Sequence, residues 1–453
     1  MLSDLELGQI IGGPASGKVI RDIHWRTQDS DASSVLFYRI GSSEKDLSNF
    51  RERITSANFA WLIVNVPVDG LPANATVIPD EKWPATQKQI LDRLYPQPKL
   101  KLIGVTGTNG KTTTTDLILQ LGSLAGKKGF SVGTLGVREY QKQILDFGLT
   151  SPSYIDLRKF LYRYGQEKDF CVMEASSHAL VQERLYGVEF DGAGWLSFSQ
   201  DHLDYHQTMD EYFKAKCRII DHLKEGAPLL VPRSQKDLLG KLKAVYQKTS
   251  DAQALPEELP LFFSTEFNRD NLEVAVALVN GVLGVRTAID FKLLSPPDGR
   301  FYIREHRGSF LVVDFAHTPD ALLNICKGIR KSFPEYRLKV LFGCGGDRDR
   351  SKRPQMGAVV DEWADLAYVT SDNPRNEDPS RIVDDILKGF TRQSPIRIVD
   401  RREAVARAFR ELQEKEVLLL AGKGHEDYIL INGVKHPYSD IRAVDAFVRR
   451  NSP

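Results

Sequence analysis

Two glycine-rich stretches of this chain end in a lysine and have the composition of phosphate-binding loops. Gly12–Lys18 fits the spacing G-x-x-x-x-G-K, but Val19 follows where a Ser or Thr would bind a metal ion. The stretch GVTGTNGKTTTT, which starts at Gly104, misses that spacing by one residue but offers Lys111 followed by Thr112. In such loops the backbone amides hold phosphate, the lysine neutralises it and the hydroxyl binds magnesium.

The elements expected around each stretch decide between the two. A phosphate loop follows a buried strand and opens a helix, so that amides and the helix N-terminus converge on the anion. Residues 101–106 form an apolar run typical of a buried strand, and a helical stretch begins at Thr112. After Gly17 the sequence KVIRDIHW alternates apolar and polar residues, which predicts a strand. We therefore predict that a nucleotide binds at the second stretch and that Gly12–Lys18 is a loop before a strand.

A carboxylate ends the later apolar run FCVME, where Glu174 is the last residue. If this run is a strand beside the loop in a parallel sheet, the Glu174 carboxylate can face a metal ion bound at the phosphates. Phosphoryl transfer needs metal ions because negative charge crowds at the reacting phosphates, and hard oxygen ligands suit magnesium. On the residues alone, a helix-capping role for Glu174 is the alternative.

Three more polar stretches, GGDRD, DNPR and GKGHE, each follow directly on an apolar run. In an open parallel sheet the loops after the strands gather along one edge, where ligands bind. This edge would hold Arg348, Asp372, Asn373, Arg375, Gly422 and Glu426. Arg375 could clamp a carboxylate through two hydrogen bonds, while Asp372 and Glu426 offer negative charge to an ammonium. A surface ion pair of Arg375 with Glu377 or Asp378 is the alternative.

Alternating strand-like and helix-like runs indicate the elements that must position these residues. Such runs alternate between two proline-containing breaks, 95–99 and 295–300, and again after a predicted hairpin over 301–316. This alternation indicates an α/β fold with largely parallel sheets covered by helices on both faces. The first 95 residues are less regular and indicate a small α/β domain. We predict domains over residues 1–97, 98–297 and 298–453.

Composition narrows the class of protein. At about 150 residues per domain, the 453 residues suggest about three domains. The 61 basic and 60 acidic residues nearly cancel, so no charge excess favours nucleic acid or a membrane surface. The four cysteines have no paired spacing, which indicates neither a disulfide framework nor a zinc site. Without a signal-peptide pattern or an apolar run of about 18 residues, we expect a cytoplasmic monomer with no membrane insertion.

Seven motifs, in order, resemble those of the Mur ligase family. They are TGTNGKTTT, MEASSHAL, DHLDYHQTMDEYFKAK, DFAHTPDAL, GCGGDRDRSKRP, DNPRNEDP and GKGHEDY, spread over about residues 100–445. Together they resemble the UDP-N-acetylmuramoyl-tripeptide synthetases of that family. The resemblance implies three domains: a small N-terminal α/β domain that binds the UDP-substrate, a central P-loop ATPase-like domain with a parallel sheet, and a C-terminal Rossmann-like domain that binds an amino acid.

The resemblance also implies an activity. Members of this branch use ATP and Mg²⁺ to join an amino acid to UDP-N-acetylmuramoyl-L-alanyl-D-glutamate through an acyl phosphate, in peptidoglycan precursor synthesis. The DNPR pattern is that of members that add meso-diaminopimelate, and Arg375 would bind the distal carboxylate that diaminopimelate has and lysine lacks.

Site residues are carried over by the matching motifs. For ATP they are Gly107, Thr108, Asn109, Gly110, Lys111, Thr112, Thr113, Asn268, Asn271, Asp314, His317 and Arg348. For the UDP-sugar-peptide they are Thr150, Ser151, Ser176, Gln182 and Arg184. For diaminopimelate they are Arg348, Asp372, Asn373, Arg375, Gly422 and Glu426. Catalysis is assigned to Lys111, Glu174, His202 and Lys216, and the metal to Thr112, Glu174, His202 and carbamylated Lys216.

Two of these neighbourhoods have a plainer interpretation. Lys216 lies two residues from Lys214, so the two point to different faces of their helix, and an ordinary surface lysine is the alternative to a carbamylated one. His178, in the same motif as Ser176, is either part of the site or a core histidine bonded to a backbone carbonyl.

The first domain departs from the family. Its members present Asp-Ser-Arg near the start, whereas residues 27–37 read TQDSDASSVLF, and the Asn expected before DHLDYH is also replaced. The mode of UDP binding is therefore open. Two other functions stay possible on the sequence: a related ligase with another acceptor or amino acid, such as a lysine-adding, folylpolyglutamate or cyanophycin-type enzyme, and a catalytically inactive nucleotide-binding protein.

Overall fold

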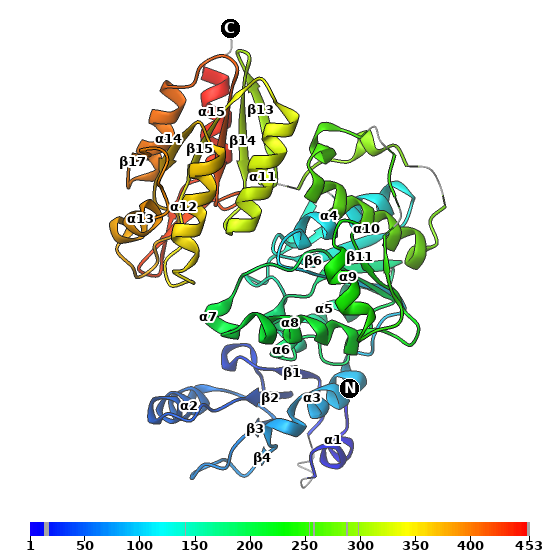
Figure 1. Cartoon of the computed structure of the whole chain (residues 1–453). Coiled ribbons are helices and arrows are strands. Elements are labelled where there is room, and N and C mark those ends of the chain that lie inside the picture. Colours follow the sequence, from blue (N-terminus) through cyan, green and yellow to red (C-terminus); the bar gives the residue numbers. More distant parts are fainter. Residues whose placement is uncertain are drawn as a thin grey trace.

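Three sheets, each flanked by helices, follow one another along the chain in the computed structural model (Figure 1). The structure describes residues 1–12, 18–140, 142–252, 254–256, 259–286, 289–297 and 299–450. Residues 13–17 of the first glycine-rich stretch lie outside the described residues, so the loop predicted there is not seen. The predicted boundaries, 97/98 and 297/298, fall in the connections between the sheets.

The N-terminal sheet has four parallel strands in the order β1-β2-β3-β4. Its elements are α1 (Asp4–Ile11), β1 (Asp22–His24), η1 (Thr27–Asp29), β2 (Ser34–Tyr38), α2 (Glu44–Ser56), β3 (Trp61–Val64), β4 (Ala75–Val77), η2 (Asp80–Lys82) and α3 (Trp83–Leu94). Four residues after Lys18 the chain enters β1, so the strand predicted for this stretch is confirmed. These strands are only three to five residues long, so each leaves a short signal and the periodicity of this region is weak.

The central sheet has eight strands in the order β12-β11-β10-β5-β9-β6-β7-β8, parallel except for the pairs that β7 makes. Its strands are β5 (Lys101–Thr106), β6 (Gly129–Gly133), β7 (Gly136–Glu139), β8 (Lys142–Leu145), β9 (Phe170–Glu174), β10 (Gly192–Trp195), β11 (Leu229–Val231) and β12 (Thr249–Asp251). Its helices are α4 (Lys111–Leu124), α5 (Tyr154–Tyr164), α6 (Ser177–Val181), α7 (Leu203–His206), α8 (Met209–Cys217), η3 (Arg218–His222), α9 (Lys236–Lys243), η4 (Leu261–Ser264), α10 (Glu266–Leu283) and η5 (Phe291–Leu293). The strands on both sides of β5 are parallel to it, so their carboxyl ends share one edge.

The C-terminal sheet has the order β13-β14-β18-β15-β16-β17 and is parallel apart from the β13–β14 hairpin, which the sequence predicted. Its strands are β13 (Tyr302–His306), β14 (Ser309–Asp314), β15 (Arg337–Phe342), β16 (Leu366–Val369), β17 (Ile396–Arg397) and β18 (Glu416–Ala421), with a separate hairpin of β19 (Tyr428–Ile431) and β20 (Val434–Pro437). Its helices are α11 (Pro319–Ser332), α12 (Lys352–Trp363), α13 (Pro379–Leu387), α14 (Arg401–Arg410) and α15 (Asp440–Arg450).

Helix α5 joins the N-terminal domain to the central one. Arg158, which is fully buried, donates to the Asp92 carboxylate (2.8 Å) and to the Tyr95 carbonyl (3.0 Å). The neighbouring Lys159 donates to the Ile23 carbonyl (2.9 Å). The first domain is therefore fixed through buried polar contacts to a helix of the central domain.

Apolar packing joins the central and C-terminal domains. One hydrophobic core runs from the central sheet through η4 and α10 into α11 and the last sheet. Gly328 of α11 lies so close to Thr265 that a Cβ there would be 2.2 Å from the Thr265 methyl group. The two domains are thus in direct contact, and their facing loops enclose a shared space.

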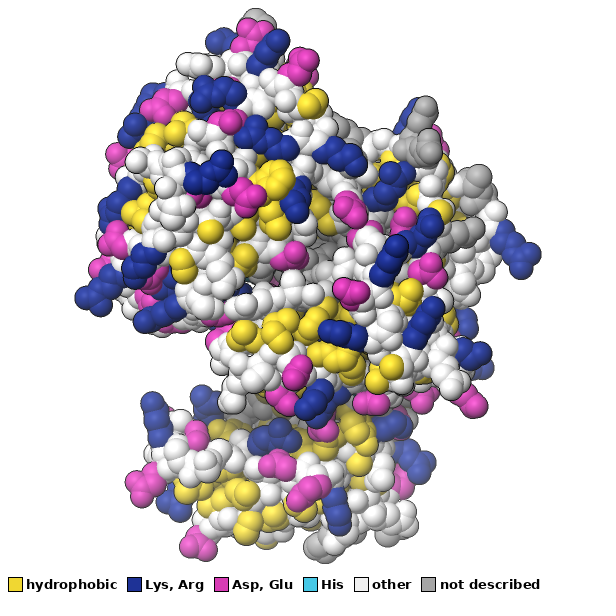
Figure 2. Space-filling view, viewed as in Figure 1, with side chains coloured by type: hydrophobic (Ala, Val, Ile, Leu, Met, Phe, Trp, Pro, Cys, Tyr) yellow, Lys and Arg dark blue, Asp and Glu magenta, His cyan; other side chains and the backbone are white. Residues whose placement is uncertain are grey.

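The surface carries both signs of charge. Figure 2 shows Lys and Arg interspersed with Asp and Glu on all three domains, as the near-zero net charge leads one to expect. Within the described residues, no helix combines the length and apolar character needed to cross a bilayer.

Candidate active site

The predicted phosphate loop connects β5 to α4 and has an open helix N-terminus. Gly110 is the N-cap of α4, with φ at 89°, and no side chain caps the first turn. The amides of this turn therefore lack the usual side-chain acceptor and point toward the loop, as an anion site requires. The strand–loop–helix context predicted for this stretch is confirmed.

Gly110 is needed here for two reasons. Its positive φ is rarely adopted by residues with a side chain, and a Cβ would lie 2.3 Å from Asn271 Oδ1 and 2.9 Å from Leu196 Cδ1. Asn271, on α10, is one of the residues predicted to bind ATP. Helix α10 therefore packs directly against the phosphate loop.

Two lysines converge on one carbonyl of the loop. Lys111 Nζ donates to the carbonyls of Gly107 (2.8 Å) and Thr108 (2.9 Å), and Lys216 Nζ donates to the same Gly107 carbonyl (2.8 Å). Lys216 is 1% exposed, whereas Lys214 is exposed and pairs with a glutamate. The prediction that the two lysines of α8 face different ways is confirmed, and the surface-lysine alternative is wrong. Burial, together with the charge of Lys111, lowers the pKa of Lys216 well below its ordinary value.

Glu174 ends β9 beside the loop and is buried. Its carboxylate accepts from the backbone amide of Thr134 (2.8 Å) and from the Thr134 hydroxyl (3.2 Å). The cap of the following helix α6 is Ser176, so the helix-capping alternative for Glu174 is wrong. The carboxylate is thus held at the edge of the cavity that also contains Lys111.

His202 lies in the loop between β10 and α7 and has a positive φ of 54°. Its Nε2 lies 3.5 Å from the Asp201 carboxylate. Burial, opposed by Asp201 and assisted by the cation Lys111, lowers the pKa of His202 to about 3, which leaves a neutral imidazole able to bind a metal. His178 packs edge-on to this ring at 4.9 Å and lines the same cavity, which favours the site over the core histidine.

Most of the predicted residues line a single cavity of about 520 Å³ between the central and C-terminal domains. These are Thr108, Asn109, Gly110, Lys111, Thr112, Thr113, Thr150, Glu174, Ser176, Arg184, His202, Lys216, His317, Arg348, Asp372, Asn373, Arg375, Gly422 and Glu426. Asn268, Asn271 and Asp314 line an adjoining cavity of about 280 Å³, which also contacts the phosphate loop. Residues more than 300 positions apart in the sequence therefore meet in one place.

Gly107, Ser151 and Gln182 line neither cavity, but each contacts a residue that does. Ser151 is buried, donates to the Glu174 carbonyl (2.8 Å) and offers its own carbonyl to Arg184 (3.1 Å). Gln182 accepts from the Arg184 guanidinium. Both residues thus orient Arg184, which does face the cavity.

Arg375 is held on the opposite wall by its backbone. The Arg375 amide donates to the Leu430 carbonyl of β19 (2.9 Å), and the Asn432 amide donates to the Arg375 carbonyl (2.8 Å). With φ at 54°, its backbone is in the left-handed region, which residues other than Gly, Asn and Asp seldom adopt. Its guanidinium donates to the Gly346 carbonyl (2.7 Å). The β19–β20 hairpin therefore fixes the backbone from which this side chain reaches the cavity.

The surface ion pair offered as an alternative for Arg375 is absent from the described contacts. Glu377 pairs with Arg350 (3.0 Å) and Arg353 (2.8 Å), and Asp378 caps α13. Arg375 is thus available to a ligand.

The acidic residues of this wall already hold a cation that the sequence analysis did not include. Lys423, fully buried, donates to Asp372 (3.1 Å), Asn373 (3.1 Å) and Glu426 (3.0 Å). Although burial raises it, the pKa of Asp372 is held below its ordinary value by Lys423 and Arg401, while burial raises the pKa of Glu426. The position of Lys423 between two glycines in GKGHE gave no periodic signal that it faces inward.

A buried ion pair fixes the strand ends that carry this wall. Arg401 binds both carboxylate oxygens of Asp440 (3.1 and 2.6 Å) and donates to the Ala421 carbonyl (3.0 Å) at the end of β18. It also donates to the Ser371 carbonyl (3.4 Å), directly before Asp372. One guanidinium thus joins the two loops that supply the C-terminal domain's wall of the cavity.

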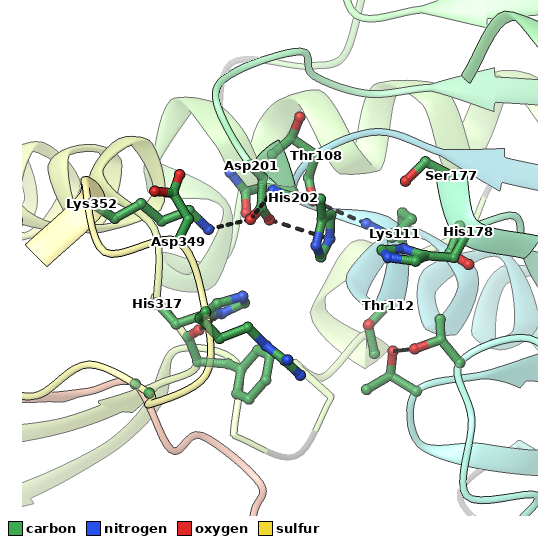
Figure 3. Close-up of a pocket in the computed structure, with 18 of the residues that line it drawn as sticks. Thr108, Lys111, Thr112, Ser177, His178, Asp201, His202, His317, Asp349 and Lys352 are labelled. Atoms are coloured by element: carbon green, nitrogen blue, oxygen red, sulfur yellow. Dashed lines mark hydrogen bonds and ion pairs between the residues drawn. The ribbon is translucent and has the colours of Figure 1, made fainter. Parts of the chain in front are cut away.

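Other residues of the cavity were also missed, and two of them make contacts that bear on the site. Arg300, in the stretch interpreted only as a domain boundary, donates to the Thr112 hydroxyl (3.4 Å) and stacks over Phe315 at 4.4 Å. Its Nε has no hydrogen-bond partner within the described part of the chain. Lys352 of α12 forms an ion pair with Asp201 across the domain interface (Figure 3). A contact between domains leaves no pattern in the sequence, which explains both omissions.

The arrangement can bring two kinds of molecule together. One wall presents a glycine loop, a free helix N-terminus and two lysines, which suit a chain of phosphates. The other presents arginines and partly neutralised carboxylates, which suit a molecule with both a carboxylate and an ammonium. Figure 3 shows the two walls meeting, with Lys352 reaching Asp201 opposite Lys111 and Thr112.

Comparison with known proteins identifies the family. The family model of the Mur ligase middle domain matches residues 105–257, and that of the Mur ligase glutamate ligase domain matches residues 299–424. The chain is 34% identical, over 90% of both chains, to the UDP-N-acetylmuramoyl-L-alanyl-D-glutamate--2,6-diaminopimelate ligase of Aquifex aeolicus.

Solved structures of Mur ligases have a similar fold over most of the chain. A UDP-N-acetylmuramoyl-L-alanyl-D-glutamate--2,6-diaminopimelate ligase matches 99% of both chains with a TM-score of 0.63 and 28% identity. The MurF ligase of Thermotoga maritima in complex with ADP matches 89% of this chain and 94% of its own, with a TM-score of 0.63 and 16% identity. The chain with this interdomain site belongs to the Mur ligase family of ATP-dependent ligases.

Proposed function

We propose that the chain adds meso-diaminopimelate to UDP-N-acetylmuramoyl-L-alanyl-D-glutamate and converts ATP to ADP and phosphate. The observation that carries the proposal is the wall formed by Arg375, Asn373 and Glu426, which lines the same cavity as the phosphate loop. Diaminopimelate ends in a carboxylate and an ammonium at the far side of the molecule, and this wall offers a partner to each. The named relatives support the same substrate.

Bond formation needs two steps, which the two walls serve in turn. A carboxylate oxygen of the UDP-linked dipeptide attacks the terminal phosphorus of ATP, and the bond to the ADP oxygen breaks. The amine of diaminopimelate then attacks the acyl carbon, phosphate leaves, and the nitrogen loses a proton. Lys111, Arg300 and the amides at the N-terminus of α4 stabilise the charge on the transferring phosphate.

Magnesium fits the donors at the loop. The hydroxyl of Thr112, the buried carboxylate of Glu174 and the neutral imidazole of His202 line one cavity, and oxygen donors are those that this ion prefers. When bound, the ion would neutralise charge on the phosphates. Lys216 lines the same cavity, and an anion carried by its side chain would add an oxygen ligand to this set.

Carbamylation of Lys216 is part of the proposal. Its Nζ is buried beside Lys111 Nζ, with the Gly107 carbonyl shared between them, so two cations lie close together out of water. Addition of CO₂ to the uncharged amine, with release of a proton, would replace one of these cations by a carbamate anion. That anion would face both Lys111 and the metal.

The remaining assignments follow from the same geometry. Asn268, Asn271 and Asp314, around the second cavity, would surround the nucleoside of ATP. Thr150, Ser176 and Arg184 would contact the dipeptide. Residues 1–97 would bind the uridine diphosphate, 98–297 the ATP and 298–453 the amino acid, in a cytoplasmic monomer.

The test is release of phosphate in the presence of ATP, magnesium and UDP-N-acetylmuramoyl-L-alanyl-D-glutamate. We expect phosphate release to depend on meso-diaminopimelate and to be far slower with lysine or ornithine. Equal rates with lysine would contradict the choice of amino acid, and release with a folate substrate alone would favour the folylpolyglutamate type. No release with any amino acid would favour an inactive nucleotide-binding protein.

A further inference from the structure

Lys423 has no role in the two steps of bond formation proposed for this cavity. Its Nζ contacts three of the residues assigned to the amino acid, Asp372, Asn373 and Glu426, at 3.0 to 3.1 Å. The side chain is fully buried, so this ammonium is a fixed component of the site. A buried charge is retained only when its partners are well placed, because its desolvation is costly.

Lys423 and the Leu430 amide together fix which way the Asn373 amide points. Asn373 Oδ1 accepts from Lys423 Nζ (3.1 Å) and from the Leu430 amide (2.9 Å), so the oxygen must face these two donors. Asn373 Nδ2 then donates to Glu426 Oε2 (2.8 Å), the oxygen that also accepts from Lys423. Glu426 is thereby held by one of its oxygens and keeps Oε1 for a ligand; Oε1 has no hydrogen-bond partner among the described residues.

Lys423 also changes the net charge that a ligand meets. Asp372 and Glu426 alone would present two carboxylates and would attract any cationic group, including the plain side-chain ammonium of lysine. With Lys423 between them, one of these charges is already balanced, and the cations Arg375 and Arg348 line the same cavity. An ammonium that arrives without its own carboxylate therefore meets a site with an excess of positive charge.

The glycines around Lys423 make this inward position possible. Gly422 has φ at 108°, and a Cβ there would lie 2.6 Å from Asp372 Oδ2. Gly424 has φ at 51°, and a Cβ there would be 2.7 Å from the Phe315 Cβ and 2.8 Å from the Gly299 carbonyl oxygen. The turn after β18 thus needs both glycines to direct Lys423 into the acidic group.

We propose that Lys423 is a specificity-determining residue that makes the site select an amino acid with a zwitterionic distal end over one with a distal ammonium alone. This inference rests on the proposed function and adds a second element of selection to Arg375. Arg375 binds the distal carboxylate, whereas Lys423 orients Asn373 and Glu426 and disfavours an unaccompanied cation.

The experiment compares full-length wild type with Lys423→Met, which keeps the length of the side chain and removes its charge. Lys388→Met is the matched control, because Lys388 is exposed and its described ion pair is with Asp385. For each protein, kcat and KM are measured with meso-diaminopimelate and with lysine, and KM with ATP. We expect the ratio of kcat/KM for diaminopimelate to that for lysine to fall about tenfold or more in Lys423→Met, mainly through KM. The KM for ATP and the Lys388→Met ratio should stay within about twofold of wild type.

A folded Lys423→Met whose two amino acids lose kcat/KM by the same factor would overturn the inference, because a purely structural role lowers both alike. If Lys423→Met does not fold, as shown by loss of its thermal transition, Lys423→Met/Asp372→Asn removes the carboxylate left unpaired. The double variant should fold and still show the reduced ratio, and an unchanged ratio there would overturn the inference.

The wild-type arm separates the two proposals. If wild type prefers diaminopimelate and Lys423→Met keeps that preference, only the role of Lys423 fails. If wild type shows no preference, the proposed function fails, and the role of Lys423 fails with it because the residue is present without selecting.

Discussion

The two walls of the active cavity recognise their ligands by different means. The wall from the central domain is mostly backbone: a glycine loop, the amides of α4 and carbonyls that orient Lys111 and Lys216. The wall from the C-terminal domain is mostly charged side chains, in which Lys423, Asp372 and Glu426 compensate one another and Arg375 remains for a ligand.

This difference has a physical meaning. Phosphate is the same in every ATP, so a backbone cradle serves it, and the cradle tolerates little change because a side chain at Gly110 would collide with Asn271. An amino-acid site made of side chains can change its selectivity by replacing one or two charges. Changes in the first wall should therefore affect every substrate alike, and changes in the second should discriminate between amino acids.

The largest effect should come from the loop lysine. We expect Lys111→Ala to reduce ligation at least about a thousandfold with any amino acid, because charge at the transferring phosphate is no longer neutralised. Lys18→Ala, at an exposed residue of the other glycine-rich stretch, should keep wild-type activity. Steady-state rates of both variants, with unfolding curves as a check on folding, decide this. Similar losses in the two variants would mean that the nucleotide site is misassigned.

Lys216→Ala should come next, with a loss of about a hundredfold or more, because an anion is missing at the metal. Acetate or propionate should restore part of the activity, whereas bicarbonate should not, since the amine that would carry the carbamate is gone. Lys214→Ala, two residues away on the exposed face of α8, is the control. A peptide mass map that shows unmodified Lys216 in active wild type would contradict carbamylation.

Arg375→Ala tests the other wall. Loss of a charge-assisted pair with a carboxylate costs about 2–5 kcal/mol, and about 1.4 kcal/mol is tenfold, so kcat/KM for diaminopimelate should fall by about thirtyfold or more. The rate with lysine should change far less, and the KM for ATP should be nearly unchanged. Arg397→Ala, an exposed arginine paired with Asp384, is the control. Equal losses for the two amino acids would show that Arg375 does not bind the distal carboxylate.

The smallest effect should come from the hairpin behind Arg375. Gly433, at its tip, has φ at 78°, so Gly433→Val strains the turn between β19 and β20. We expect the KM for diaminopimelate to rise about fivefold while the KM for ATP stays constant, because a strain of about 1 kcal/mol reaches only the amino-acid wall. Gly226→Val strains a turn of the central domain with a similar φ of 75° and is the matched control. A rise in the KM for ATP in Gly433→Val would contradict the separation of the walls.

The phosphate wall could be predicted from sequence because its parts are contiguous. Strand, loop and helix follow one another from Lys101 to Leu124, and each has a local signal in hydrophobic periodicity or glycine content. Helical spacing predicted that Lys214 and Lys216 face different ways, but only the resemblance to the family indicated that Lys216 is the one that faces inward. The parallel sheets could be predicted because each strand and helix of the alternating series also gives a local signal in the sequence.

The amino-acid wall was only partly predictable because its contacts join separate loops. The motifs identified Asp372, Asn373 and Glu426, but the three converge on Lys423, whose direction depends on two glycines with positive φ. Arg300 lies in the connection between domains, where no period applies, and the pair of Lys352 with Asp201 exists only when the domains meet. That the N-terminal domain binds UDP stays a prediction, because residues 27–37 lack the Asp-Ser-Arg motif of the family.

The hydrogen bonds between Arg375 and the β19–β20 hairpin make these two segments one exchangeable module. Residues 372–375 and 428–437 are far apart in the sequence, yet the Arg375 backbone is bonded on one side to Leu430 and on the other to Asn432. In a chimera that transplants the DNPR segment alone, the arginine would pack against a hairpin from another protein. Its positive φ would then lack the backbone hydrogen bonds that hold it here. Redesign of this enzyme for a new amino acid should therefore transplant loop and hairpin together, as two halves of a single part.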